Sequence, residues 1–264
     1  MKRNEYSTLI LQSLTENKEQ LKKQFASSKS QIGYFFVDNL LPEEEVLGLY
    51  NSFPKANEMV LKKSIREDKY VAAQMNLYNP ILEEIIYAFQ DKRIVALIGE
   101  ICEISEMIPD ENLYAGGISM MGNKQFLNPH LDNSHDKDRE LWRVLNLLYY
   151  ITPNWEEEYG GNLELWPNGL SKPQITIHSK FNRLAIMATH NGSLHSVSPV
   201  VFEGFRCCVS NYYFSKKPGI SIIKLCTEVD AQEKTTSGTT LQYLRTLIAN
   251  RLIKFDIQQP FQKL

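Results

Sequence analysis

Several features that define common protein classes are missing from this chain of 264 residues. Basic and acidic side chains nearly balance, with 29 Lys and Arg against 31 Asp and Glu, so no surplus of positive charge is available to neutralise nucleic-acid phosphates. No run of about 18 apolar residues is present, which argues against a membrane span. A polar stretch at 15–23 stands where a secretory signal would need an apolar core. We therefore expect neither a nucleic-acid nor a membrane partner.

Cysteine is scarce, and its spacing is informative. The four cysteines are Cys102, Cys207, Cys208 and Cys226, and none of them forms a CxxC pair. This pattern predicts reduced thiols in a cytoplasmic protein rather than a disulfide framework. A closed structural zinc site with four ligands is likewise not indicated. The remaining composition, 43% apolar and 23% charged, is typical of an ordinary globular protein.

The first part of the chain shows helical periodicity. Apolar residues predict a surface helix over 6–27, with Leu14, Leu21 and Phe25 on one stripe, and a pair of helices over 80–104. A further helix is expected to open at Pro42, because proline suits a first helical turn and three glutamates follow it. The short apolar run at 34–37 suits a buried strand.

The residue pattern of the sequence changes after Pro109, where short apolar runs alternate with residues that favour turns. The runs predict eight strands at 113–121, 125–132, 143–151, 161–166, 174–178, 183–189, 194–201 and 205–214. Eight strands in about 100 residues, mostly joined by turns, suit a jelly roll better than a parallel α/β sheet. A last amphipathic helix is expected at 238–252.

These elements predict a mainly β protein with flanking helices, an α+β fold built on a double-stranded β-helix or jelly-roll core. We interpret residues 1–264 as one domain, because no linker or repeat divides the chain. The expected parts are a helical N-terminal part over 1–108, the jelly-roll core over 109–216, and a C-terminal helical extension over 217–264.

A candidate metal site combines two histidines and one carboxylate. His130 and Asp132 are two residues apart on a predicted strand, where side chains at i and i+2 project to the same side. His195, on another predicted strand, is the candidate third ligand. Two imidazoles and one carboxylate can occupy one face of an octahedron, as in non-haem Fe(II) oxygenases, and leave the other positions open.

Arg206 follows His195 by eleven residues, on a strand whose same face carries Cys208, Ser210 and Tyr212. A buried arginine needs an anionic partner, because an unpaired charge is costly inside a protein. A dicarboxylate ligand would supply one through a bidentate contact. From the strand pattern alone, a surface arginine with a packed stem remains the alternative.

An ordered series of motifs runs from His130 to Phe214. After the HLD motif at 130–132 come RVLNLLYYITPNW at 143–155, GGNLELWP at 160–167, KFNRL at 180–184, and HSVSPV at 195–200 followed by Arg206. This series resembles the Fe(II)- and 2-oxoglutarate-dependent dioxygenases. Within them it is most similar to the prolyl-hydroxylase branch, which includes the oxygen-sensing prolyl hydroxylases.

The resemblance implies that His130, Asp132 and His195 hold Fe(II), and that 2-oxoglutarate and dioxygen are cosubstrates. Arg206 and Tyr150 would bind the distal carboxylate of 2-oxoglutarate. The implied reaction is hydroxylation of an unactivated C–H bond in a peptidyl proline or a small metabolite, with release of succinate and CO2. A non-catalytic, cupin-like jelly roll that binds a metal or a ligand is the alternative.

Three departures from that branch stand out. Met120 lies where the branch has a tyrosine that reaches the cosubstrate, and Asn146 lies where it has a threonine. The spacing from His195 to Arg206 is two residues longer, so we expect a bulge or turn at 202–204.

The other histidines are expected to have ordinary structural roles. We interpret His178 and His190 as surface or hydrogen-bonded core residues. His135 lies in the charged loop 133–140, which is either a solvated face or a lid whose acidic residues meet a cationic substrate.

Overall fold

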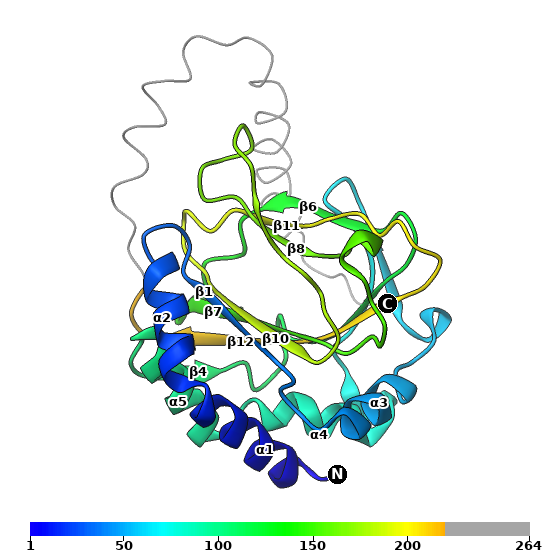
Figure 1. The fold of residues 1–264 in the computed structure, drawn as a ribbon, viewed down its shortest axis with the longest axis horizontal. Helices are drawn as coiled ribbons and strands as arrows, with labels where there is room; N and C mark the ends of the chain where they lie inside the picture. Colours follow the sequence, from blue (N-terminus) through cyan, green and yellow to red (C-terminus); the bar gives the residue numbers. More distant parts are fainter. Residues whose placement is uncertain (220–264) are drawn as a thin grey trace.

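The computed structural model describes residues 1–219, and within them one curled antiparallel sheet is covered by helices on one side (Figure 1). The helix expected at 238–252 and Cys226 lie outside the described residues. The α-helices are α1 (Arg3–Glu16), α2 (Lys18–Ser28), α3 (Glu43–Asn51), α4 (Pro80–Ala88) and α5 (Lys92–Cys102), with short 3-10 turns η1 (Ala56–Glu58), η2 (Met75–Leu77) and η3 (Glu157–Tyr159).

The first predicted helix is two helices. Its apolar stripe is as expected, since Leu14, Leu21 and Phe25 are all buried. The chain breaks at Asn17, whose side-chain Nδ2 donates to the Ser13 carbonyl at 2.9 Å. An asparagine that bonds its own helix backbone competes with the regular ladder, which explains the interruption. The helices expected at Pro42 and over 80–104 are confirmed.

The sheet contains every strand that the sequence predicted and three more. Its strands are β1 (Tyr34–Asp38), β2 (Val60–Lys63), β3 (Glu67–Ala72), β4 (Met107–Pro109), β5 (Gly117–Met121), β6 (Phe126–His130), β7 (Trp142–Tyr150), β8 (Leu163–Leu165), β9 (Ile175–Ile177), β10 (Arg183–Ala188), β11 (His195–Val197) and β12 (Arg206–Ser215). The main order is β1-β10-β7-β12-β5-β3-β6-β11-β8-β9. The strands β6, β11 and β8 curl over β7, β10 and β12 in Figure 1. This is the double-stranded β-helix fold expected from the sequence.

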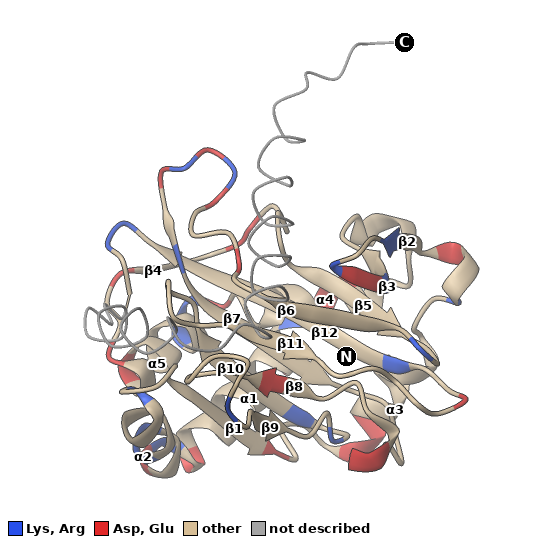
Figure 2. Cartoon of the chain, turned by 90° about the horizontal axis from the view of Figure 1, so that it is seen from above, with Lys and Arg blue, Asp and Glu red and all other residues tan. Residues whose placement is uncertain are grey.

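The N-terminal part is not purely helical. Besides β1, which was expected, it supplies the hairpin β2–β3, and β3 lies between β5 and β6 in the sheet. The hairpin is rich in Lys, Arg, Asp and Glu (Figure 2), so the apolar alternation that marks a strand is hidden. Its pairing with distant strands, and not its local pattern, makes it part of the sheet.

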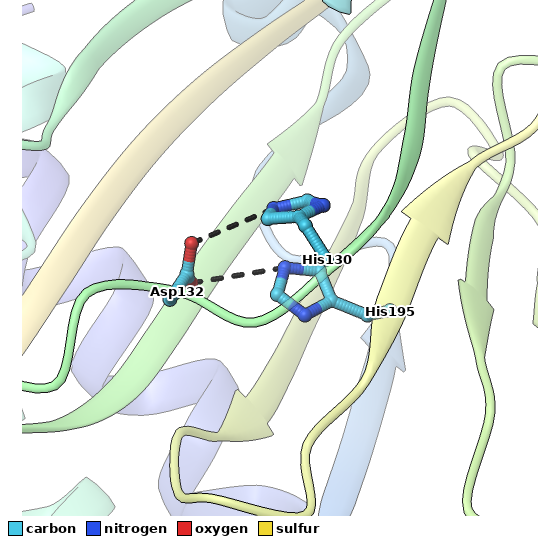
Figure 3. A group of neighbouring side chains, drawn as sticks. All are labelled: His130, Asp132 and His195. Carbon is cyan, nitrogen blue, oxygen red and sulfur yellow. Dashed lines mark ion pairs between the residues drawn. The ribbon is translucent and has the colours of Figure 1, made fainter. Parts of the chain in front are cut away.

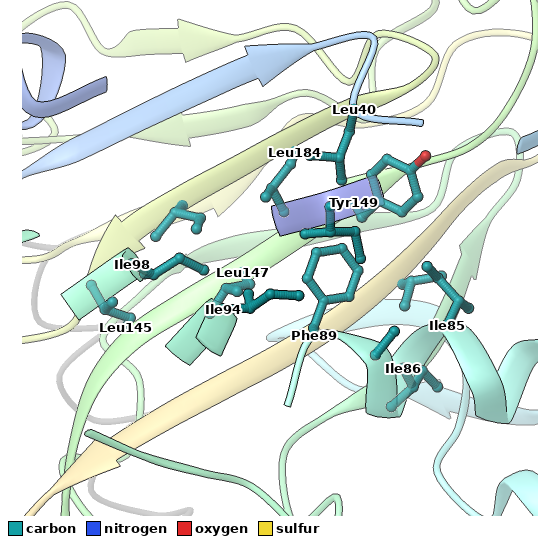
Figure 4. Packing of buried hydrophobic residues seen from close by; sticks show 14 of the residues in the cluster. Leu40, Ile85, Ile86, Phe89, Ile94, Ile98, Leu145, Leu147, Tyr149 and Leu184 are labelled. Atoms are coloured by element: carbon teal, nitrogen blue, oxygen red, sulfur yellow. The ribbon is translucent and has the colours of Figure 1, made fainter. Parts of the chain in front are cut away.

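The central strand β7 is buried on both faces. Leu145, Leu147 and Tyr149 point to one side and pack with residues of α4 and α5, such as Ile86 and Ile98 (Figure 4). The alternate residues of β7 point to the opposite side, inside the curl, because side chains alternate along a strand. The helices thus bury one face of the sheet and leave the inner face for functional side chains.

Candidate metal centre

Three side chains converge inside the curl, two from strands and one from the residues just after β6, which ends at His130 and not at 132 as expected. His130 ends β6, Asp132 follows two residues later, and His195 begins β11, directly opposite His130 in the register. The Asp132 carboxylate lies between the two rings, with Oδ1 3.6 Å from His130 Nε2 and Oδ2 3.7 Å from His195 Nε2 (Figure 3). One ligand atom from each residue lies within 4.8 Å of the others. The juxtaposition predicted from the sequence is therefore present.

Backbone hydrogen bonds orient both imidazoles. His130 Nδ1 lies 2.8 Å from the Asn128 carbonyl oxygen, and His195 Nδ1 lies 2.9 Å from that of Ser193. A carbonyl can only accept, so each Nδ1 carries the proton and each Nε2 presents a lone pair towards Asp132. This is the tautomer that a metal requires, held by the kind of outer contact that metal-binding histidines use.

The electrostatics of the cluster favour metal binding. Burial and the neighbouring His130 lower the pKa of His195 to about 4, so its ring is neutral at pH 7. Burial opposes ionisation of Asp132, but His195, His130 and the guanidinium of Arg143 hold the pKa of that carboxyl below its usual range. Asp132 Oδ2 is buried without a hydrogen-bond partner within residues 1–219. A cation bound to this oxygen would remove the cost of burying it unpaired, so the residues present fit a divalent metal.

A second set of unpaired polar atoms lies on the inner face of β12 and β7. Arg206, at the start of β12, is 3% exposed, and its guanidinium carbon lies 5.4 Å from the ring centre of Tyr150. Arg206 Nε and the Tyr150 hydroxyl are both buried without hydrogen-bond partners among the described residues. Burial raises the pKa of Tyr150, which keeps the phenol protonated as a donor. One bound carboxylate would satisfy both groups, as expected for the distal end of 2-oxoglutarate.

A glycine makes room for Arg206. Gly161 has a φ of +68°, and a Cβ at this position would lie 2.9 Å from Arg206 Cδ and 3.2 Å from Val200 Cγ2. Any larger residue would therefore be strained in its backbone and would press on the arginine. This explains physically the second glycine of the motif at 160–167.

The departures noted in the sequence have different outcomes. Met120 does not face the pocket: it packs on the helix-covered face, and its neighbour Met121 is the residue whose Sδ lies 2.9 Å from Arg206 Nη2. Met120 therefore does not take the place of that tyrosine, because neighbouring residues of a strand face opposite sides. Asn146 is 4% exposed, its Oδ1 has no hydrogen-bond partner among the described residues, and it lies opposite Tyr212 on the inner face. The expected turn is present, since Gly204 N donates to the Phe202 carbonyl.

Sequence reasoning missed Arg143 as a site residue. Its guanidinium is buried, with Nη1 3.6 Å from Asp132 Oδ1 and the guanidinium carbon 4.4 Å above the ring of Tyr212. By simple alternation Arg143 would share the helix-covered face with Leu145. A register irregularity between Tyr213 and Phe214 of the paired strand β12 interrupts that alternation. No local signal in the sequence marks it.

The remaining histidines lie outside the cluster. His178 Nε2 bonds to the Trp155 carbonyl at 3.0 Å, and His190 Nε2 bonds to that of Ile32 at 2.9 Å. Both are satisfied by backbone partners, as predicted. His135 packs against Trp142 with ring centres 4.0 Å apart.

Two protein-family models match parts of this chain. Residues 116–214 match the family model of the 2OG-Fe(II) oxygenase superfamily. A second model, the TnsA endonuclease C terminal, matches residues 209–257, of which the structure describes 209–219 as the end of β12 and the residues after it. No curated protein matches the chain.

Solved structures share the fold at low identity. A prolyl-4-hydroxylase from Pseudomonas putida is 14% identical with a TM-score of 0.55, covering 74% of this chain and 98% of its own. A prolyl hydroxylase from Trichoplax adhaerens, in complex with a peptide fragment of hypoxia inducible factor, is 20% identical with a TM-score of 0.53, covering 76% and 92%. HygX from Streptomyces hygroscopicus, with nickel, 2-oxoglutarate and hygromycin B bound, is 13% identical with a TM-score of 0.50, covering 73% and 86%.

The family match runs from β5 to β12 and therefore contains all five predicted site residues. The matched segment and the cluster of His130, Asp132 and His195 support an enzyme of the 2OG-Fe(II) oxygenase kind, with Fe(II), 2-oxoglutarate and dioxygen as cofactor and cosubstrates. Its fold resembles that of the prolyl-4-hydroxylases. Within residues 1–219, no helix is long and apolar enough to cross a bilayer.

Proposed function

We propose that this enzyme hydroxylates an unactivated C–H bond of a peptidyl proline or a small metabolite and converts 2-oxoglutarate to succinate and CO2. The observation that carries the proposal is the pairing of two sites inside one curl. One is the convergence of His130, Asp132 and His195. The other is formed by Arg206 Nε and the Tyr150 hydroxyl, which are buried without hydrogen-bond partners within residues 1–219.

In this proposal the three converging residues hold Fe(II) from one side. His130 and His195 bind through Nε2, since their Nδ1 protons are committed to backbone carbonyls. Asp132 contributes one negative charge and is kept ionised by Arg143. The bound iron and its cosubstrates supply the oxidative chemistry, while the protein supplies orientation and a water-poor cavity.

Arg206 and Tyr150 orient 2-oxoglutarate in this proposal. The guanidinium forms a charge-assisted contact with the distal carboxylate, and the phenol donates a second hydrogen bond. Cys208 is buried on the same inner face and excludes water beside them. The overall reaction is balanced: one oxygen atom of O2 enters succinate, the other enters the substrate as hydroxyl, and CO2 leaves.

Both substrate kinds occur among the structural neighbours, one of which holds a peptide and another the small molecule hygromycin B. This leaves peptide and metabolite as alternatives. A cytoplasmic location and the absence of a nucleic-acid partner stay predictions.

The test is succinate formation from 2-oxoglutarate by aerobic protein with Fe(II). We expect slow turnover even without substrate, and near-complete loss in Asp132→Ala, which removes the charged ligand. His190→Ala is a matched control, because His190 is bonded to backbone and lies outside the cluster. Absence of turnover together with failure to retain any divalent metal would favour the non-catalytic, cupin-like alternative. Normal turnover in Asp132→Ala would show that the ligands are misassigned.

A further inference from the structure

A cluster of exposed apolar side chains lies on the loop that leads into β12. Val201, Phe202 and Phe205 are 69%, 38% and 44% exposed. The half-buried ring of Tyr159, in η3, stacks on Phe202 with ring centres 3.8 Å apart, and the Tyr159 carbonyl accepts a hydrogen bond from Val201 N at 2.9 Å. These four residues form what we term the aromatic patch. Exposed apolar groups gathered in this way mark interaction surfaces.

The rings of the aromatic patch are supported by the protein beneath them. The buried ring of Trp155 meets that of Phe202 edge to face, with ring centres 5.8 Å apart. The ring of Phe205 lies on the backbone of Gly122, where an added Cβ would come within 2.7 Å of a ring carbon. Side chains that are already positioned lose little conformational entropy when a partner covers them.

Carboxylates border the aromatic patch. Four exposed glutamates are next to its residues or within two positions of them in the chain, and we term them the acidic rim: Glu156, Glu157, Glu158 and Glu203. None of the four forms an ion pair within residues 1–219. Lys124 is the one basic residue in the segments that build this surface, which are 122–124, 155–159 and 200–205. The surface therefore suits a partner that is both apolar and positively charged.

This chain carries a segment of that chemistry outside the described residues. The stretch 238–252, for which the sequence predicts an amphipathic helix, has an apolar stripe made of Leu241, Leu244, Ile248 and Leu252. Its charged residues are both basic, Arg245 and Arg251, and a helix of about 3.6 residues per turn places one on each side of that stripe. We propose that the segment 238–252 docks on the aromatic patch of its own chain, with the two arginines facing the acidic rim.

The length of the connecting chain permits this contact. Arg206 begins β12 beside the aromatic patch, and Ser215 ends it, so the chain leaves the sheet about 30 Å from the patch at 3.3 Å per residue. Residues 220–237 can span up to roughly 60 Å when extended. A tethered segment also reaches an effective concentration on the order of millimolar, which favours it over a separate protein of similar chemistry.

Two other arrangements are less favourable. A symmetric dimer through the aromatic patch would bring the same surface of both copies together, so the two acidic rims would repel each other. A groove of about 780 Å³ between α5 and β4 could also receive an amphipathic helix. Its carboxylates Glu100 and Glu103 are already paired with Lys18 and Lys29, at 2.5 and 2.6 Å, so it offers less to two arginines than the acidic rim does.

The docked segment would cover the loop 200–205, which leads directly into Arg206. It would thus form part of the wall beside the predicted 2-oxoglutarate pocket. The contact itself requires neither a metal nor turnover, so its test is independent of the proposed function.

Photo-crosslinking of the full-length protein tests the contact. p-Benzoylphenylalanine replaces Val201, which leaves the three rings of the patch and the acidic rim intact, and mass spectrometry identifies the crosslinked peptides. We expect irradiation to join position 201 to the segment 238–252. A mixture of 14N- and 15N-labelled protein shows whether both ends of a crosslink belong to one chain. The same photoreactive residue in place of Ile65, which is 85% exposed on the β2–β3 turn, is the control and should not reach that segment.

Charge reversal tests the part played by the acidic rim. Glu157→Lys combined with Glu158→Lys should lower the yield of the crosslink at least about threefold at low ionic strength, because both charges would repel the arginines. Adding Arg245→Glu and Arg251→Glu to that protein should restore the yield. Asp138→Lys with Glu140→Lys, at two exposed acidic residues of the loop 133–140, is the matched control and should leave the yield unchanged.

Three results would each overturn the inference. The first is a set of crosslinks from position 201 that avoids the segment 238–252. The second is a crosslink to that segment found only between two chains, which would indicate exchange between copies. The third is a crosslink yield that the reversal of Glu157 and Glu158 does not change.

Discussion

Arg206→Ala offers the sharpest test of the cosubstrate pocket. The arginine is 3% exposed, its Nε is unpaired within the described residues, and Met121 Sδ is a weak partner for Nη2. Alanine would leave the distal carboxylate of 2-oxoglutarate buried against Tyr150 alone. The loss of a charge-assisted contact of about 2 to 3 kcal/mol corresponds to a rise on the order of a hundredfold in the Kd for 2-oxoglutarate.

The metal site should be nearly unaffected by this change, because Arg206 is not among the three converging ligands. Titration of 2-oxoglutarate into anaerobic Fe(II)-loaded protein, followed by the absorption of the chelate, measures the first effect. Mn(II) binding in the absence of 2-oxoglutarate, followed by electron paramagnetic resonance, measures the second.

Arg93→Ala is the control, because Arg93 is a half-exposed arginine paired with Asp91 on α5. It should leave both affinities unchanged. Arg206→Lys should recover only part of the affinity, since an ammonium lacks the planar pair of donors. An unchanged Kd for 2-oxoglutarate in Arg206→Ala would show that another residue binds the distal carboxylate and would refute this reading of the pocket.

Three further perturbations test separate parts of the structure. Tyr150→Phe should raise the Kd for 2-oxoglutarate by about tenfold, because one hydrogen bond to the cosubstrate is lost. The hydroxyl of Tyr149 bonds Asn182 on the opposite face, so Tyr149→Phe should lower the unfolding free energy by about 1 kcal/mol and leave that Kd unchanged. Equal effects of the two substitutions on the Kd would contradict the assignment of faces. Gly161→Ala should weaken 2-oxoglutarate binding, because the added Cβ would lie 2.9 Å from Arg206 Cδ. It should also lower the melting temperature, because the backbone of residue 161 has a φ of +68°. A wild-type affinity for 2-oxoglutarate would show that the arginine can move freely. In metal-free protein, the pKa of His195 is lowered to about 4, so between pH 6.5 and 4 the unfolded chain binds more protons at this residue than the folded chain does. The free energy of unfolding should therefore fall as the pH falls, by roughly 3 kcal/mol at most. Urea unfolding of wild type and His195→Gln measures this effect, and an identical pH dependence in the two proteins would show that the ring is not held neutral.

Much of the fold was predictable because the relevant signals are local. The strands β5 to β12 each combine a short apolar run with flanking turn residues, and β7 is apolar along most of its length. The helices α3, α4 and α5 follow from capping residues and apolar stripes. The hairpin β2–β3 was missed because its charged residues obscure strand alternation, and α1 and α2 were merged because one asparagine does not by itself mark a break.

The site shows the same division. The spacing of His130 and Asp132 indicated a possible ligand pair, and only the ordered series of motifs made that pair specific and pointed to His195, Arg206 and Tyr150. Arg143 and Met121 could not be assigned to the inner face, since each depends on a strand register that one irregularity or one residue of offset reverses.

The order of residues along the chain determined which strands and helices form and which side chains are suited to bind a metal and a dicarboxylate, because these properties depend on neighbours in the sequence. Only the tertiary structure decided that the metal ligands lie beside the buried guanidinium of Arg143. Long-range strand pairing sets which distant side chains meet, and burial turns their mutual charges from weak surface effects into strong determinants of what can bind.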